Sequence, residues 1–529
     1  MNRLSRPLAE LQDSYEVVVI GSGYGGGIAA SRLARAGRQV CLLERGREIL
    51  PGEYPDTLPE AVKETQVHGP HGQAGSRTGL LEFRLHDDIS VFQGCGLGGT
   101  SLVNANVSLP ADRWVFDDPH WPAEVLADYD TLLADGYRRA TEMLRPRPCP
   151  DTAPALAKQG ALARSAAHLG AALTRPPINV TFTAGVNHVG VEQAACTHCG
   201  DCVSGCNVGA KNTTLMNYLP DACNFGAHIF TQVSVRHLSR AADGRWLVHY
   251  QPLHTGREAF DAPLMTLRAS IIVLAAGTLG STEILLRSRD HGLPLSAALG
   301  HRFTGNGDVL AFGYNNDIPV NGVGFGLHNP HHVPPVGPCI TSAIDLRGAA
   351  QGEKGMIIEE GSIPGALAPL LPGVLATVAA LVGKDTDHGL GDELKEQARV
   401  VESAVQGSYR GAVRHTQTYL VMSHDDTGGS MRLNQDRLQV DWPGVGLQPT
   451  FQRVNKALEK ATQATGGTFV ENPAWSNLFG QGSDLMTVHP LGGCAMGASA
   501  ATGVVNHKGQ VFAGPAADAP VYDGLYIAD

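Results

Sequence analysis

The stretch YEVVVIGSGYGGGIAASRLARAGRQVCLLERG, residues 15–46, decides the fold. Its VVVI run predicts a buried parallel strand, IAASRLARAG predicts a helix, and QVCLLE predicts a second strand. Gly21, Gly23 and Gly26 form a G-x-G-x-x-G turn between strand and helix, and Glu44 ends the second strand about twenty residues later. We therefore predict a dinucleotide site in which the helix N-terminus faces a pyrophosphate and Glu44 binds a ribose hydroxyl.

The composition is that of a large globular protein. A chain of 529 residues, 43% hydrophobic and 17% charged, exceeds one hydrophobic core, so we expect two domains or one large composite fold. The formal net charge of −11 and the lack of a Lys/Arg run argue against a nucleic-acid partner. No apolar segment of signal-peptide length opens the chain, and six of the ten cysteines are scattered singly. We therefore expect a cytoplasmic protein, with a location peripheral to the membrane as the alternative.

Further segments along the chain have the features of nucleotide-binding strands and turns. They are VFQGCGLGGTSLVNANV (91–107), ASIIVLAAGTLGSTEILLRS (269–288), TVHPLGGCAMG (487–497) and DGLYIAD (523–529). Such dispersed elements predict one nucleotide-binding domain that is assembled from separated segments.

These motifs, in this order and over nearly the whole chain, resemble the glucose–methanol–choline (GMC) flavoprotein oxidoreductases, and most closely their cholesterol oxidase branch. The resemblance implies FAD rather than NAD on the glycine turn. It also implies an α/β fold with a Rossmann-like FAD-binding domain and an α+β substrate domain that contains a sheet. The FAD-binding domain would comprise residues 14–48, 90–110, 225–305 and 480–529. The substrate domain would comprise residues 49–89, 111–224 and 306–479, with a cysteine-rich loop at 196–206.

The resemblance also implies roles for single residues. Near the flavin it places Gly98, Gly99 and Ser101 (pyrophosphate), Asn104 (isoalloxazine), Val233 (adenine) and Asp529, with Val107 facing the substrate. His489 in VHPLGGCAMG matches the active-site histidine of the family. An imidazole there accepts the hydroxyl proton of an alcohol while hydride passes to flavin N5, or it holds the alcohol by a hydrogen bond.

Two departures from the family pattern affect the expected chemistry. Cholesterol oxidases of the well-known type carry a substrate-side glutamate for double-bond isomerisation, but the matching region GAVRHTQ has no acid. Glu359 and Glu360 are candidate substitutes, although paired acids more often face solvent, so oxidation is better supported than isomerisation. In the family, the strand matching GLYIAD continues into a segment with a second polar active-site residue, Asn or His. The sequence here ends at Asp529, before such a segment, so we expect it to be a fragment of a longer protein.

The stretch SIPGALAPLLPGVLATVAALVG, residues 362–383, approaches the length of a membrane span. Pro364, Pro369 and Pro372 should break its first half as a helix. We expect a buried loop and helix over the substrate site, and this favours a small, apolar, sterol-like alcohol as substrate. A lid that contacts a membrane or admits a lipid-like substrate is the less favoured alternative.

Four cysteines lie close together in CTHCGDCVSGCN. Cys196, Cys199, Cys202 and Cys206 have the C-x2-C-x2-C-x3-C spacing of bacterial ferredoxins, which predicts a 4Fe-4S or 3Fe-4S cluster. Asn207 follows where ferredoxins have proline, and no second run occurs, so Cys223 or Cys149 could serve as an outside ligand. A cluster-free loop, a zinc site and disulfides remain alternatives.

The sequence as a whole predicts FAD-dependent oxidation of an alcohol CH–OH group. With a cluster, electrons would leave singly to a protein or quinone acceptor, and the enzyme would be a dehydrogenase. The alternatives are a cluster-free oxidase that uses O2, a flavin-dependent lipid isomerase or hydratase, and a non-enzymatic carrier of flavin and cluster.

Overall fold

A computed structural model describes the chain except for residues 1, 71, 257–262, 330–331, 349–353, 388 and 472–484. The predicted start of the last FAD-binding segment, residue 480, therefore lies outside the described residues.

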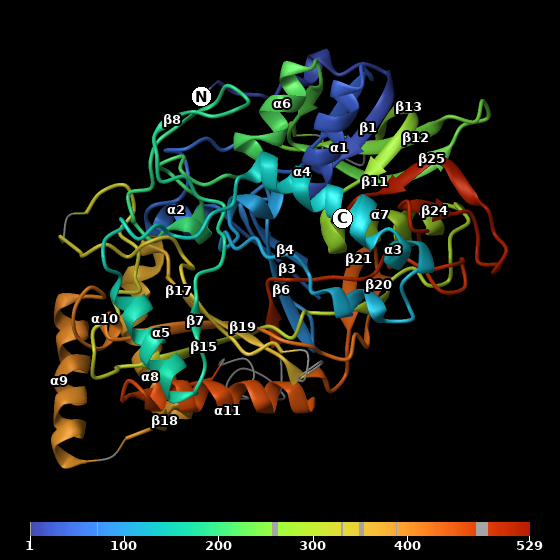
Figure 1. Ribbon diagram of the computed structural model, residues 1–529. Coiled ribbons are helices and arrows are strands. Elements are labelled where there is room, and N and C mark those ends of the chain that lie inside the picture. Colours follow the sequence, from blue (N-terminus) through green and yellow to red (C-terminus); the bar gives the residue numbers. More distant parts are fainter. Residues whose placement is uncertain are drawn as a thin grey trace.

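The opening stretch forms the centre of a mainly parallel sheet with the strand order β10-β2-β1-β13-β12-β11 (Figure 1). Its strands are β1 (Ser14–Ile20), β2 (Val40–Leu43), β10 (His228–Phe230), β11 (Val233–Arg240), β12 (Trp246–Pro252) and β13 (Met265–Leu274), with β25 (Val521–Ile527) beside β13 and β24 (Gln510–Phe512) beside β25. The predicted segments 269–288 and 523–529 thus join the opening stretch in one sheet through β13 and β25, whereas 91–107 and 487–497 begin in strands of another sheet.

Burial on both faces explains why β1 is continuously apolar. Val18 packs into one hydrophobic core and Val17 and Val19 into another, on the opposite side of the sheet. Helices α1 (Tyr24–Arg35) and α6 (Tyr218–Asn224) cover one face, and α7 (Gly277–Asp290) covers the other (Figure 1).

A largely antiparallel sheet of order β18-β22-β15-β19-β17-β16-β7 forms the other half of the molecule. Its strands are β7 (Leu173–Thr174), β15 (Val309–Tyr314), β16 (Ala343–Asp345), β17 (Ile357–Gly361), β18 (Lys384–Asp385), β19 (Gln417–Met422) and β22 (Thr468–Val470). Helices α5 (Ala157–His168) and α11 (Pro449–Gln463) pack against this sheet on the side of Val309 and Ala311.

A third sheet, of order β23-β6-β5-β3-β4, joins the two halves. Its strands are β3 (Thr65–Gly69), β4 (Gly72–Gly75), β5 (Leu81–Arg84), β6 (Ile89–Gly94) and β23 (Leu485–Thr487). Because β6 and β23 are parallel, both end at one edge, where β6 leads into the loop after Gly94 and β23 leads to His489. The expected domain boundary at 89/90 falls at the start of β6, whose partner β5 lies across it.

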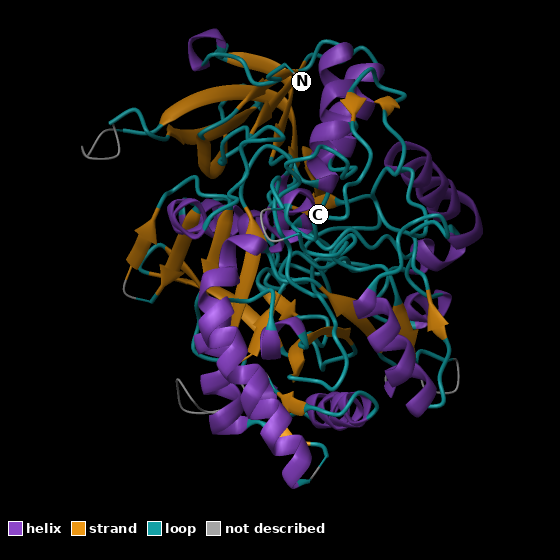
Figure 2. Ribbon diagram, turned by 90° about the vertical axis from the view of Figure 1, so that its left-hand side faces the viewer, coloured by secondary structure: helices purple, strands orange, loops and turns teal. Residues whose placement is uncertain are grey.

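The remaining described elements lie outside these three sheets. The strands are β8 (Gly185–Val186), β9 (Glu192–Gln193), β14 (His301–Phe303), β20 (Gly429–Asn434) and β21 (Arg437–Asp441). The helices are α2 (Leu58–Lys63), α3 (Ala123–Ala127), α4 (Ala134–Leu144), α8 (Leu371–Val382), α9 (Leu390–Gln406) and α10 (Gly411–Arg414). The 3-10 turns are η1 (Leu8–Glu10), η2 (Gly99–Leu102), η3 (Arg113–Asp117), η5 (Cys202–Ser204), η6 (Thr214–Met216), η9 (Gly365–Leu370) and η10 (Val445–Leu447), and η4 (Tyr129–Leu133) is a π-turn. Figure 2 shows that loops fill the middle of the molecule, between the sheets.

The apolar stretch differs from its expected form. It folds as η9 followed by α8, which begins near Pro372, and one face packs through Leu375 and Val378. The opposite face is exposed, since Leu370, Val374 and Leu381 are 46%, 52% and 62% exposed. Among the described residues, Gly365–Val382 is the helical segment long and apolar enough for a membrane span, by length and composition alone. The expectation of a buried loop and helix over the substrate site is therefore wrong, because the helix covers the substrate-domain sheet with one face only and lines no part of the main cavity.

Candidate active site

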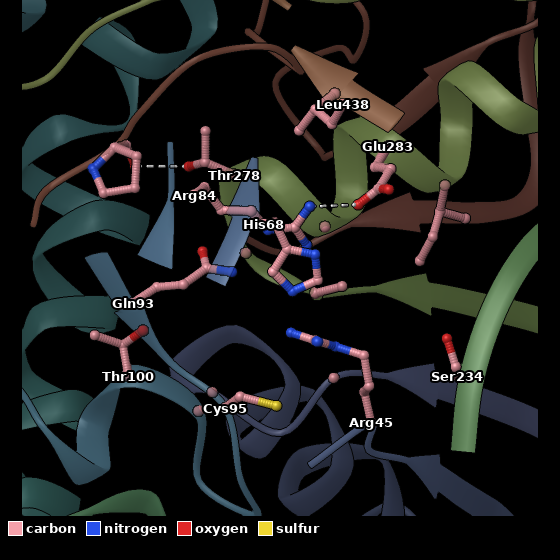
Figure 3. Close-up of a pocket in the computed structure, with 18 of the residues that line it drawn as sticks. Arg45, His68, Arg84, Gln93, Cys95, Thr100, Ser234, Thr278, Glu283 and Leu438 are labelled. Carbon is pink, nitrogen blue, oxygen red and sulfur yellow. Dashed lines mark hydrogen bonds and ion pairs between the residues drawn. The ribbon is translucent and has the colours of Figure 1, made fainter. Parts of the chain in front are cut away.

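A cavity of about 750 Å³ runs between the sheet that contains β1, here called the nucleotide-binding sheet, and the sheet that contains β6, here called the connecting sheet. This volume is in the range of small-molecule and cofactor sites. The glycine turn after β1 lines one part of it and His489 lines another. Figure 3 shows polar side chains from several elements projecting into this space.

The N-terminus of α1 opens on the cavity without a capping side chain and without an acid in its first turn. Gly21 has φ +98°, and a Cβ there or at Gly26 would meet a backbone oxygen at 2.1 or 2.0 Å. A Cβ on Gly23 would meet no protein atom within 4 Å. The first and third glycines thus serve tight packing, and the second leaves room beside free helix N–H groups, where a phosphate group fits.

Glu44 lies beside this turn and is buried. One of its carboxylate oxygens accepts hydrogen bonds from Ser22 N–H (3.1 Å) and Oγ–H (2.6 Å), and the other accepts one from Gly46 N–H (2.7 Å). Burial raises the pKa of Glu44, while these donors oppose the rise. Each oxygen keeps acceptor capacity toward the cavity that it lines, which suits a ribose hydroxyl.

The loop after β6 and the residue Asp529 also line this part of the cavity. The loop after β6 contacts the glycine turn closely, because a Cβ on Gly99 would lie 2.9 Å from the Cα of Gly23. At the end of the chain, Asp529 accepts hydrogen bonds from Gly277 N–H (2.9 Å) and the Ser281 hydroxyl, and burial raises its pKa to about 6. The uncapped helix, the ribose acid and the cavity together fit an FAD molecule.

His489 is held by Asp308, a residue that no sequence motif marks. Its ring Nδ1 lies 2.7 Å from Asp308 Oδ1, and Asp308 Oδ2 accepts the backbone N–H groups of Val488 (2.9 Å) and His489 (3.2 Å). Asp308 is 5% exposed. Burial opposes a charge on His489, but the charge and hydrogen bond of Asp308 raise its pKa overall. Within the part of the chain that the structure describes, Nε2 has no hydrogen-bond partner, so it is free to meet a ligand.

Glu359 of β17 interacts electrostatically with His489 and Asp308. Glu359 and Glu360 are 1% and 0% exposed, so the expectation that such a pair faces solvent is wrong here. Glu360 is paired with buried Lys158 (3.2 Å), whereas Oε1 of Glu359 has no hydrogen-bond partner. Burial raises the pKa of Glu359 to about 8.

An ion-pair network that sequence patterns do not reveal forms a further wall of the cavity (Figure 3). Glu82 is 0% exposed and accepts hydrogen bonds from Arg45 and from Arg84 Nε (2.8 Å). Arg84 also reaches Glu283 (3.3 Å). Burial opposes ionisation, but the two arginines hold the pKa of Glu82 below its usual range.

The structure brings eight of the twelve residues predicted for the flavin, the proton and the substrate to one cavity. Its lining includes Gly21, Gly23, Glu44, Gly99, Ser101, Val233, His489 and Asp529. The lining does not include Gly26, Gly98, Asn104 or Val107. Asn104 donates to the Tyr24 hydroxyl (2.9 Å), and Val107 packs beside Cys202 and Cys339. The roles assigned to these residues stay predictions.

The four predicted cysteine ligands surround one small, separate cavity together with Lys211. Asn207 fixes the loop by accepting the N–H groups of Gly52 (3.0 Å) and Tyr54 (2.9 Å). Asp201 fixes it by accepting the Gly365 N–H (2.6 Å).

Other cysteines lie at different distances from this loop. Cys339, 133 positions after Cys206, packs beside Cys202, and Cys149 shares an apolar cluster with Cys196 and Cys206. Cys223 lies in another cluster, under the nucleotide-binding sheet. In the described residues, no three cysteine sulfurs lie within 4.8 Å of one another.

Comparison with known families agrees with this geometry. A protein-family model described as GMC oxidoreductase matches residues 24–304, more than half of the chain. A second family model with the same description matches residues 418–517. The chain belongs to the GMC oxidoreductase family.

Relatives of this GMC oxidoreductase include enzymes named for alcohols. It is 27% identical to a cholesterol oxidase of Mycobacterium tuberculosis, over 98% of this chain and 87% of the relative. It is 23% identical to a long-chain-alcohol oxidase of Arabidopsis thaliana, over 98% of this chain and 64% of the relative. A fungal aryl-alcohol oxidase structure, 15% identical, shares the fold with a TM-score of 0.52, over 98% of this chain and 95% of its own.

These matches make the chain an FAD-dependent oxidoreductase with a mixed α/β fold and a sheet-rich substrate domain. They support flavin-dependent alcohol oxidation as its activity. They give no support for an iron–sulfur cluster.

Proposed function

We propose that this GMC oxidoreductase oxidises the hydroxyl group of an apolar, sterol-like alcohol to a carbonyl. The observation that carries the proposal is His489, which Asp308 holds at 2.7 Å with Nε2 free at the cavity. When bound, FAD supplies the acceptor for the hydride that leaves the alcohol carbon. The alcohol thus loses one hydride from carbon and one proton from oxygen, and a C=O bond forms.

His489 handles the proton in this reaction. Asp308 accepts from Nδ1, which leaves Nε2 as the basic atom and fixes the orientation of the ring. After the proton moves, the Asp308 carboxylate stabilises the imidazolium, which agrees with the raised pKa of His489. The same Nε2 hydrogen bond positions the alcohol before it reacts.

The proposed class of substrate rests on the alcohols for which the relatives are named. Curated relatives over nearly the full chain are named for cholesterol and for long-chain alcohols. An assay panel of sterols, long-chain alcohols and sugars tests this choice. We expect turnover of a sterol or a long-chain alcohol, and activity confined to sugars would contradict the proposed class.

We also propose that electrons leave through an iron–sulfur cluster on Cys196, Cys199, Cys202 and Cys206. For each alcohol oxidised, two electrons would pass one at a time to a protein or quinone acceptor, and two protons would be released. The alternative is reoxidation by O2 to hydrogen peroxide. Iron analysis and an EPR spectrum of anaerobically purified, dithionite-reduced protein test the cluster, because iron-free protein with bound flavin would exclude the cluster route.

A second activity, double-bond isomerisation, is favoured by one observation. Glu359 is buried near His489 with a free oxygen and a pKa of about 8, so it can exchange a proton near neutral pH. With a Δ5 sterol, Glu359→Gln should accumulate the unrearranged ketone at an unchanged oxidation rate. An E359Q enzyme that still forms the conjugated ketone would exclude this role.

Two further proposals concern the division and location of the protein. We propose that the FAD-binding and substrate domains follow the segments predicted from the sequence, with the cysteine loop in the substrate domain. We propose a cytoplasmic location, and cell fractionation that recovers the protein only with membranes would contradict it.

A further inference from the structure

Lys211 connects the cysteine loop to the loop that reaches the glycine turn. Its side chain is 2% exposed. Nζ donates to the backbone carbonyls of Leu102 (3.1 Å) and Asn104 (2.6 Å) on one loop and of Cys202 (3.1 Å) on the other.

The three acceptors define the charge of this group. A neutral amine carries two N–H donors, whereas an ammonium carries three, so the three carbonyl partners match the charged form. Burying a charge is costly unless an opposite charge lies nearby. Among the ion pairs of the described residues, none joins Lys211 to a carboxylate within 4.0 Å.

Cysteine sulfurs are the groups that face Lys211. Its electrostatic partners are Cys202, Cys206 and Cys339. Neutral thiols or a disulfide would supply no negative charge, whereas metal-bound thiolates would. Lys158 shows the contrast, because this equally buried lysine has the carboxylate of Glu360 at 3.2 Å.

Asn106 supplies an independent observation at the same place. Its side chain is 1% exposed and interacts with the Cys202 sulfur, and neither amide atom has another hydrogen-bond partner among the described residues. A buried amide normally uses both its donor and its acceptor, so the spare capacity beside Cys202 marks a position where a missing group would complete the hydrogen bonds.

The spacing of the sulfurs separates the metal alternatives. A single tetrahedral zinc ion, with Zn–S bonds of about 2.3 Å, needs its sulfurs roughly 3.8 Å apart. No three cysteine sulfurs of the described residues are within 4.8 Å of one another. A cluster spaces its ligands farther apart, because each thiolate binds a different iron atom.

We infer that Lys211 is the counterion of an anionic iron–sulfur cluster on the four cysteines and ties that cluster to the flavin-side loop. This inference rests on the cluster proposed above. A fixed positive charge favours the reduced, more negative cluster, so Lys211 sets its potential for accepting electrons. Lys211 is thus a positioning and tuning residue that lines the cysteine cavity and not the main cavity.

The test compares wild-type protein with Lys211→Met, Lys211→Gln and Lys211→Arg, all purified anaerobically. Iron per chain, flavin per chain and the cluster midpoint potential from an EPR-monitored titration are measured. We expect K211M and K211Q to shift the midpoint to more negative values, although Gln keeps hydrogen-bond donors. K211R should keep the wild-type midpoint, and all variants should keep their flavin.

Each contrary result overturns a different statement. Wild-type protein without iron refutes both the cluster and the role of Lys211, and leaves alcohol oxidation to be judged by the substrate panel. Iron-loaded variants that all titrate at the wild-type midpoint refute the role of Lys211 alone. If the variants fail to fold, iron is removed from wild-type protein and its Tm is measured. The counterion role requires Tm to fall, because removal of the cluster leaves the charge of Lys211 buried without a partner. An unchanged Tm refutes the role.

Discussion

At the scale of single residues, the chemistry of the cavity depends on a pair from distant parts of the chain. His489 follows β23, and Asp308 directly precedes β15. The pair is fixed further by Thr487, whose hydroxyl donates to Asp308 Oδ2 (2.8 Å). Every oxygen of Asp308 is therefore used to hold the histidine segment, which gives the ring one orientation.

Asp308→Asn should slow alcohol oxidation by about 10²-fold or more, because Nε2 is then neither oriented nor made basic. Since Asp308 raises the pKa of His489, the variant should also move the acidic limb of the pH–rate profile to lower pH. The measurement is kcat against pH. The matched control is Asp425→Asn, which removes an aspartate that caps Thr304 and Gly305 nearby. Equal profiles for wild type and D308N would contradict the role of Asp308.

A substitution at Gly23 should weaken cofactor binding without affecting folding. The φ of −62° at Gly23 suits alanine, and a Cβ would meet no protein atom within 4 Å. Gly23→Ala should therefore keep the free energy of unfolding of the flavin-free protein within about 1 kcal/mol but reduce flavin content severalfold. Gly160→Ala, an open helical position in α5, is the control and should keep its flavin. A G23A protein with full flavin content would show that the pyrophosphate lies elsewhere.

At the scale of elements, the glycine turn could be predicted and the histidine's partner could not. Residues 15–46 contain strand, turn, helix and acid in one local pattern, so the nucleotide-binding core follows from the sequence. Asp308 and Cys339 meet their partners through tertiary packing over more than 100 residues, and no local spacing marks them. Lys211 follows Cys206 by only five residues, but its contact with Leu102 on the other loop spans 109 residues and could not be predicted. The exposed face of α8 was also hidden, since an all-apolar stretch does not reveal which of its sides is covered.

The orientation of α8 gives a stability prediction. Leu375 is 4% exposed in the cluster under the helix, whereas Leu381 is 62% exposed. Leu375→Ala should lower the free energy of unfolding by about 2–5 kcal/mol, and Leu381→Ala should change it by less than about 0.5 kcal/mol. Denaturant titrations of the two variants give both values. Equal losses would mean that the outer face is covered in solution.

At the scale of the whole molecule, the nucleotide-binding sheet, the connecting sheet and the β20–β21 hairpin bring remote segments to one cavity. Buried polar groups also make stability depend on pH. His237 of β11, His249 of β12 and His291 after α7 stack with ring centroids 4.0 and 3.9 Å apart. Burial, and then the neighbouring histidines, lower the pKa of His237 to about 4. The stack therefore joins the antiparallel edge of the nucleotide-binding sheet to α7 only while its rings are neutral.

Because the folded pKa of His237 lies below its unfolded value near 6.5, its contribution to stability is complete above that pH. It is lost as pH falls from about 6.5 toward about 4. His237→Phe keeps an aromatic ring but cannot be protonated. The fall in Tm between pH 7 and pH 5 should be smaller in H237F than in wild-type protein, and an equal fall would assign the effect to other groups.

The most direct test of the central claim is anaerobic mixing of the flavin-loaded protein with a sterol or long-chain alcohol, followed by absorbance of the flavin. Wild-type protein should bleach in a single turnover with formation of the ketone or aldehyde, and His489→Ala with full flavin content should bleach at least about 10²-fold more slowly. Flavin that stays oxidised in wild-type protein with every alcohol, or that bleaches equally fast in H489A, would contradict alcohol oxidation by the His489–Asp308 pair.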